Sequence, residues 1–234
     1  ALVLSNAAKR PLPRFWYFPS QNRALLLTTG DQHGDSVTNS INETNTVQSF
    51  GGKFTNFLWY SFGSISNSQV NTWLSAGHAI GVHFNDTGET NSTGVGGSAA
   101  SWNGMQSVIS DSLTSFAATY PTAPTPTTTR NHFLIWVSRN AAGTPDQTAQ
   151  AKLFQNAGIE LDVSYTTFPR RWGYMTGSGL PMKFLDTTTG AVIPVFEQAT
   201  QYEDDVQLGG ADYSMKWDLP TAQSHYQKSL SDSL

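Results

Sequence analysis

The sequence predicts an α/β fold built on a largely parallel sheet. Short apolar runs and amphipathic stretches alternate along the 234 residues, and glycines often stand where one gives way to the next. Such recurrences are typical of βα units, whose strands lie parallel in one sheet. We expect a single domain over residues 1–234, with residues 1–22 as an N-terminal extension and residues 206–234 as a C-terminal helical segment.

The individual elements follow from hydrophobic spacing. Helix 101–120 has the strongest pattern, because its apolar residues recur every three or four positions. Thr144 and Pro145 predict an N-cap and first turn for the helix that ends at Gly158. Gly190 predicts the left-handed position of a β-hairpin turn. The other expected elements are strands 23–28, 79–84 and 159–165, hairpin strands 180–186 and 191–198, and helices 69–76, 146–157 and 218–230.

Composition limits the classes of function. Only 13% of residues are charged, about half the usual share, and the net charge is −4, which argues against a nucleic-acid partner. Abundant amides, hydroxyls and tryptophans favour a neutral ligand such as a carbohydrate, and few lysines favour an extracellular or cell-surface protein. No apolar run approaches the roughly 20 residues of a membrane span. The absence of cysteine excludes disulfides and cysteine-type zinc sites.

Three polar motifs, each beside an apolar run, hold four of the five histidines. They are LLLTTGDQHGD (25–35), AGHAIGVHFND (76–86) and TTTRNHFLIW (127–136). In α/β folds ligands bind at the carboxyl ends of the strands, where these Asp and His residues are expected. The motifs therefore predict a metal-centred hydrolytic site.

The first motif places Asp31 and His33 between Gly30 and Gly34, directly after an apolar run. A carboxylate and an imidazole there can hold a divalent ion or act as a base. The alternative is a turn in which the aspartate caps a loop.

The second motif offers two histidines, His78 and His83. Because they are five residues apart, they point to opposite faces of a strand. We expect His83, at the carboxyl end, to face the site and His78 to be structural.

The third motif does not decide which of its residues form a strand. Either the apolar FLIWV is the strand, or residues 127–130 form it and His132 stands at its outgoing end, able to meet Asp31 and His83. In the second case the forked guanidinium of Arg130 is able to orient a carboxylate.

Later candidates have weaker support. Asp162 and Tyr165 end or follow a strand, and Asp162 either orients a His or Arg or is a solvated strand residue. The acidic run Glu203–Asp205 is expected to be a solvated turn, and His225 a surface residue. Neither a G-x-S-x-G motif nor a dinucleotide fingerprint is present.

The chain resembles the polysaccharide deacetylase superfamily (NodB homology, carbohydrate esterase family 4) in the order and content of three segments. They are LLLTTGDQHG, AGHAIGVHFND and the TR-containing strand. GIELDVSYTTFP, GYMTGSGLPMKF and EQATQYEDD resemble a divergent bacterial branch of it, and the resemblance covers roughly Pro13 to Asp205. It implies a distorted (β/α) barrel. It also implies a divalent ion, often zinc, held by one Asp and two His, which activates water to attack an acetyl group on a glycan.

Carried over by position, Asp31 matches the metal-binding Asp of the family and His83 its first metal-binding His. Gly30 stands where the catalytic base Asp would be, and Thr87 where the second metal-binding His would be. The resemblance therefore leaves His132 as the replacement ligand.

The resemblance also leaves His33 or Asp35 as the replacement base. The last barrel strands, with the catalytic-acid His, have no counterpart after Glu203. The barrel is expected to be incomplete there, unless the domain is truncated or another element completes it.

The resulting hypothesis is a divergent metal-dependent hydrolase, with zinc as the expected ion, that removes acyl groups from a carbohydrate or other acylated small molecule. The alternative is a catalytically silent glycan-binding or structural surface protein, in which tryptophans such as Trp59, Trp102 and Trp172 stack on sugars. The expected site comprises metal ligands Asp31, His83 and His132, catalytic residues His33, Asp35, Arg130 and Asp162, and substrate-binding residues Tyr165 and Trp172.

Overall fold

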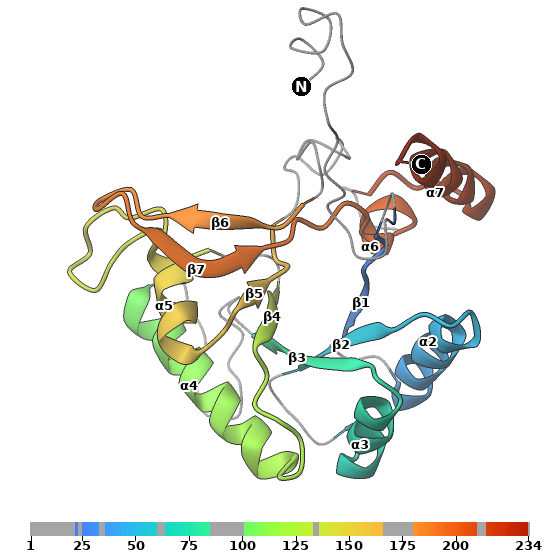
Figure 1. The fold of residues 1–234 in the computed structure, drawn as a ribbon, viewed down its shortest axis with the longest axis horizontal. Helices are drawn as coiled ribbons and strands as arrows, with labels where there is room; N and C mark the ends of the chain where they lie inside the picture. Colours follow the sequence, from blue (N-terminus) through green and yellow to red (C-terminus); the bar gives the residue numbers. More distant parts are fainter. Residues whose placement is uncertain are drawn as a thin grey trace, which may run out of the picture.

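The computed structural model describes residues 22, 25–32, 36–59, 64–84, 101–132, 136–165, 180–209 and 214–233. Seven strands form one sheet in the order β1-β2-β3-β4-β5-β7-β6 (Figure 1). The strands are β1 (Thr28–Asp31), β2 (Phe54–Trp59), β3 (Ala79–Phe84), β4 (Thr128–Asn131), β5 (Leu161–Asp162), β6 (Met182–Leu185) and β7 (Val192–Glu197). The helices are α2 (Val37–Ser49), α3 (Asn67–Ser75), α4 (Trp102–Thr119), α5 (Ala149–Ala157), α6 (Asp204–Gln207) and α7 (Leu219–Ser233).

The sheet is parallel except for the β6–β7 hairpin. The predicted α/β class, with a largely parallel sheet and a hairpin, is therefore confirmed. Gly190 adopts a φ of 72° in the hairpin turn, as expected. In the described part of the chain β1 and β6 are the two edges, so the sheet stays open instead of closing as a barrel.

Helices α2 to α5 line the outer side of the curved sheet (Figure 1). The main core lies between this side and the helices, where Leu58, Val82 and Phe84 meet side chains of α3, α4 and α5. The opposite side of the sheet carries the site described below. No described helix is long and apolar enough to cross a membrane.

Serine side chains start three of the helices. Ser36, Ser66 and Ser101 each accept a hydrogen bond from the backbone N–H three residues on. Such caps satisfy a helix N–H that would otherwise lack a partner, and each contributes about 1 kcal/mol. Helix α4 matches the prediction for 101–120 to within one residue at each end.

Helix α5 begins three residues later than predicted. Pro145 forms a β-bridge with Arg139 instead of opening the helix. The Asp146 carboxylate accepts hydrogen bonds from the backbone N–H and hydroxyl of Thr148 and from Lys152. These contacts hold the segment before Ala149 out of helical geometry. The C-terminal stop at Gly158, with a φ of 77°, is as predicted.

The prediction for the first strand was wrong. Leu25, Leu26 and Leu27 are exposed, and β1 begins only at Thr28, which pairs with Phe54. The partner strand β2, which the sequence analysis did not identify, decides where β1 starts. Because β2 lies between β1 and β3, it joins the first polar motif to the second.

Candidate functional site

The strands β1, β3 and β4 carry Asp31, His83 and Arg130 near their carboxyl ends, as parallel pairing requires. Trp59, His83 and Arg130 are register partners on β2, β3 and β4, so their side chains leave the same face of the sheet. His83 is almost fully buried, whereas the Asp31 side chain is 24% exposed. The site is therefore a cluster of polar side chains in a largely buried part of the sheet.

Asp31 contacts both basic side chains. Its Oδ2 lies 3.7 Å from His83 Nε2, and its Oδ1 lies 3.4 Å from Arg130 Nη1. The aspartate predicted as a metal ligand therefore faces the predicted histidine on one side and the predicted carboxylate-orienting arginine on the other.

The orientation of the His83 ring is fixed by the backbone. His83 Nδ1 lies 2.8 Å from the carbonyl oxygen of Arg130, which can only accept a hydrogen bond. Nδ1 must therefore carry the proton, and in the neutral imidazole Nε2 presents its lone pair towards Asp31. A backbone carbonyl in this role is a common partner of a metal-ligating histidine.

His132 follows β4 directly and is buried beside His83. The centroids of the two imidazole rings are 5.4 Å apart, and the Trp59 ring lies 4.6 Å from His132 and 5.2 Å from His83. The interpretation in which the strand precedes His132 is thus confirmed. Residues 133–135 lie outside the described residues, and Trp136 and Val137 are not in a strand.

The structure therefore gathers four of the predicted residues: Asp31, His83, Arg130 and His132. Among the described residues, however, no three His, Asp or Glu side chains stand close enough to count as a ready metal centre. Asp31 Oδ2 and His83 Nε2 are 3.7 Å apart, and the His132 ring lies beside the His83 ring, with 5.4 Å between their centroids.

Glu203 is a site residue that sequence reasoning missed. Its side chain is buried, and its Oε1 lies 3.8 Å from Arg130 Nη2, so Arg130 stands between two carboxylates. The expectation that Glu203 belongs to a solvated turn was wrong. No local pattern marks this residue, because its partner is on a distant strand and only the fold brings them together.

Asp162 lies on the other face of the sheet from Arg130. It is the register partner of Thr129, the residue next to Arg130. Ser164 donates both its backbone N–H and its hydroxyl to Asp162, and the Ser164 oxygen accepts from the Asn131 N–H. Asp162 thus supports the backbone of β4 instead of touching the gathered side chains.

The buried neighbour of Asp162 is Glu197. The two carboxyl groups are close enough to interact, and Glu197 Oε1 accepts the backbone N–H of Tyr165 at 2.9 Å. Burial raises the pKa of Glu197, and the Asp162 carboxylate raises it further. Burial also raises the pKa of Asp162, against hydrogen bonds from Ser164 that lower it. The pair therefore keeps a shared proton at neutral pH.

The remaining candidates are distributed as follows. His33, Asp35 and Trp172 lie outside the described residues. Tyr165 is exposed, with its backbone bound to Glu197.

The two other described histidines behave as expected. His78 is structural, because its Nδ1 accepts the Phe54 N–H at 3.0 Å and its Nε2 lies 3.1 Å from Gln48. His225 is exposed on α7, stacked on Trp217.

Gly30 packs closely against the Phe54 ring. A Cβ built on Gly30 would lie 2.8 Å from the Phe54 ring, closer than real Cβ contacts. An aspartate cannot enter this position without displacement of the ring. The local packing therefore favours glycine at position 30.

No family model and no curated protein matches the chain. Among solved structures it is similar to a protein assigned as a polysaccharide deacetylase from Mycobacterium smegmatis, with a TM-score of 0.56 and 12% identity, over 85% of this chain and 60% of that one. A protein assigned as a polysaccharide deacetylase in O-antigen biosynthesis from Bordetella bronchiseptica gives a TM-score of 0.46 and 14% identity, over 78% and 60%. A family 4 carbohydrate esterase from Streptomyces lividans gives 0.40 and 18%, over 60% and 62%.

The open parallel sheet with its outer helices is an α/β fold that this chain shares with the Mycobacterium structure. The resemblance to the polysaccharide deacetylases that the motifs indicated is thus confirmed at the level of the fold. The chain spans 60% of the length of the Mycobacterium structure.

Proposed function

We propose that this protein is a metal-dependent hydrolase that removes acyl groups from a carbohydrate. One observation carries the proposal: the Asp31 carboxylate faces the Nε2 of His83 at 3.7 Å. The shared fold with a polysaccharide deacetylase supports the class of reaction. We also infer an extracellular or cell-surface location, which the composition favours.

The Asp31–His83 separation suits a cation. Because His83 Nδ1 donates to the Arg130 carbonyl, the neutral ring sets a lone pair against a carboxylate oxygen. Two such acceptors repel each other unless a proton or a cation lies between them. Their separation is longer than a hydrogen bond and shorter than the sum of two zinc–ligand bonds, about 4.1 Å.

We assign the ligands as Asp31, His83 and His132, with zinc as the first candidate ion. A bound zinc ion would supply a water nucleophile near neutral pH by lowering the pKa of that water towards ~7. Arg130 orients Asp31, and the Trp59 ring packs against both imidazoles and excludes bulk water from them.

The hydrolysis needs a general base and a leaving group. A water molecule attacks the acyl carbonyl carbon, the base accepts its proton, and the sugar nitrogen or oxygen departs as it is protonated. We assign the base to His33 or Asp35, next to Asp31 in the sequence.

A second candidate is a glycan-binding or structural surface protein without catalytic activity. The observation that favours it is the Arg130 guanidinium, which lies 3.4 Å from Asp31. An arginine already neutralises that carboxylate and competes with a metal for it. Metal binding therefore separates the two proposals.

The test is zinc stoichiometry, measured by a chelator-dye titration, together with hydrolysis of acetylated glycans. The hydrolase binds about one zinc ion, and His83→Ala and His132→Ala each lose both zinc and activity. His225→Ala, an exposed histidine on α7, is the matched control and retains both. If wild type binds no zinc and neither site variant alters hydrolysis, the hydrolase is excluded and the silent protein stands.

A further inference from the structure

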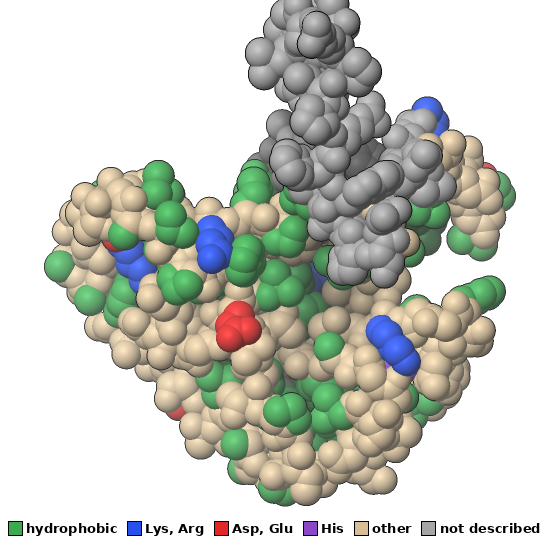
Figure 2. All heavy atoms as spheres, viewed as in Figure 1, with side chains coloured by type: hydrophobic (Ala, Val, Ile, Leu, Met, Phe, Trp, Pro, Cys, Tyr) green, Lys and Arg blue, Asp and Glu red, His purple; other side chains and the backbone are tan. Residues whose placement is uncertain are grey.

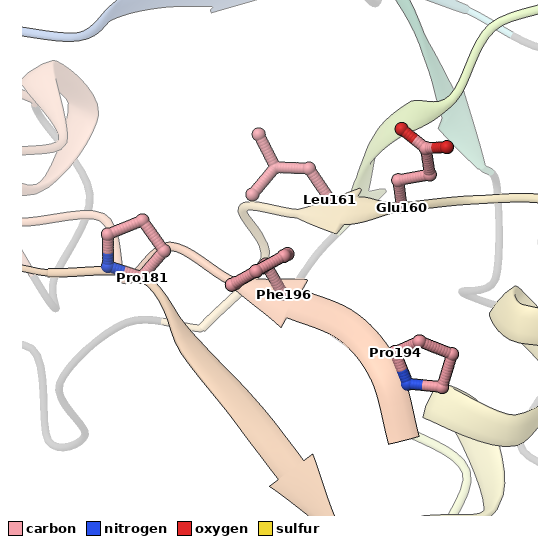
Figure 3. Close-up of a pocket in the computed structure, with 5 residues that line it drawn as sticks. All are labelled: Glu160, Leu161, Pro181, Pro194 and Phe196. Atoms are coloured by element: carbon pink, nitrogen blue, oxygen red, sulfur yellow. The ribbon is translucent and has the colours of Figure 1, made fainter. Parts of the chain in front are cut away.

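An open pocket lies between the start of β5 and the β6–β7 hairpin (Figure 3). Its volume is about 480 Å³, within the range of roughly 300–1,000 Å³ of small-molecule sites. Figure 2 shows that the surface in this view carries many apolar side chains and few charged ones. The pocket is lined by Glu160, Leu161, Pro181, Pro194 and Phe196.

The pocket shares a sheet face with the candidate site. Phe196 is the register partner of Leu161, and Leu161 is the register partner of Thr128. Thr128 lies two residues before Arg130, so all of these side chains leave the same face. Phe196 is two strands from β4, roughly 10 Å across the sheet at the usual strand spacing. A ligand that reaches both places is therefore longer than a single sugar.

The lining has the chemistry of a sugar-binding surface. Phe196 is 39% exposed and, with the two proline rings, offers flat apolar surface. Glu160 also lines the pocket, and the Lys183 ammonium lies over one face of the Phe196 ring, with its Nζ 4.7 Å from the ring centroid. A pyranose has an apolar C–H face and a rim of hydroxyl groups, so it can contact the proline rings and the other face of Phe196 and exchange hydrogen bonds with both charges. Both charged residues are exposed, so their charges stay accessible to the hydroxyl groups of a sugar.

We propose that this pocket is a subsite for a neutral sugar residue of a longer glycan whose acyl group is presented to Asp31 and His83. The proposal rests on the proposed function for the reacting end of the ligand. The subsite itself makes a separate, measurable contribution to affinity. It selects oligosaccharides over monosaccharides.

Calorimetric titrations in the His83→Ala background test this, because a ligand is not consumed there. The probes are β-1,4-linked hexamers of N-acetylglucosamine, glucose and xylose, each with its monosaccharide. We expect one hexamer to bind and Phe196→Ala to weaken it about five- to tenfold. Phe196→Leu, which keeps apolar volume and the strand, gives a similar loss. Val192→Ala, a 62% exposed residue of the same strand outside the lining, stays within about twofold.

The proposal is overturned if no hexamer binds, or if the Phe196 variants bind as tightly as Val192→Ala. The two proposals fail separately. Zinc-dependent hydrolysis of a small acetyl ester without hexamer binding removes the subsite and keeps the hydrolase. Hexamer binding that depends on Phe196 in a chain without zinc keeps the subsite and removes the hydrolase.

Discussion

The buried carboxyl pair makes the stability of this protein depend on pH. Glu197 is buried against Asp162, and burial followed by the neighbouring carboxylate raises its pKa to about 10. In the unfolded chain a glutamate has a pKa of about 4.3. Between these values the folded state holds one proton more than the unfolded state, so the free energy of unfolding falls as the pH rises.

The size of this pH dependence follows from the one extra proton that the folded state holds. The slope is about 1.4 kcal/mol per pH unit, so the change from pH 5 to pH 8 has a ceiling of about 4 kcal/mol. Glu197→Gln removes this contribution to the pH dependence, because the neutral amide has nearly the same shape and hydrogen-bonding groups as the protonated acid. Its nitrogen donates to Asp162, and its oxygen still accepts the Tyr165 N–H.

Urea unfolding at a series of pH values measures the difference. We expect the wild type to lose stability relative to Glu197→Gln as the pH rises from 5 to 8. Glu160→Gln, an exposed glutamate beside β5, is the matched control and follows the wild type. Parallel pH profiles for wild type and Glu197→Gln would refute the shared proton.

Two further predictions concern packing and charge. Gly81→Ala should cost about 1–3 kcal/mol in urea unfolding, because the new Cβ would lie 2.4 Å from the Phe57 ring and 2.8 Å from a backbone oxygen; unchanged stability would contradict the packing. Glu203→Gln should destabilise the fold by about 1–3 kcal/mol, since Arg130 loses a buried partner. In an Arg130→Met background the loss should shrink, and an equal loss in both backgrounds would show that Glu203 does not act through Arg130.

Local patterns predicted the parts of the fold that depend on near neighbours. Helix α4, the β6–β7 hairpin and strand β3 each carry a repeat that can be counted along a few turns or residues. The placement of His83 on the side of the sheet opposite the main core follows from the same alternation. These predictions succeed because each pattern lies within one short, continuous stretch of the sequence.

Elements and contacts that depend on distant partners were missed. Strand β2 reads FTNFLW, with polar residues inside, and its strand character comes from pairing with β1 and β3 on both sides. Three exposed leucines suggested a strand that has no partner there. Glu203 and Glu197 look like ordinary surface acids, and only the fold buries them beside Arg130 and Asp162.

By itself the sequence determined the α/β class, the polar motifs and which residue types meet at the carboxyl ends of the strands. Hydrophobic period is a local property that can be taken from neighbouring residues, and the alternation of strands and helices implies parallel strands. The tertiary structure decided which charges face each other: Asp31 with His83 and Arg130, Arg130 with Glu203, and Asp162 with Glu197 on the other face. Those pairings depend on strand register and burial, which distant segments fix only when the chain has folded.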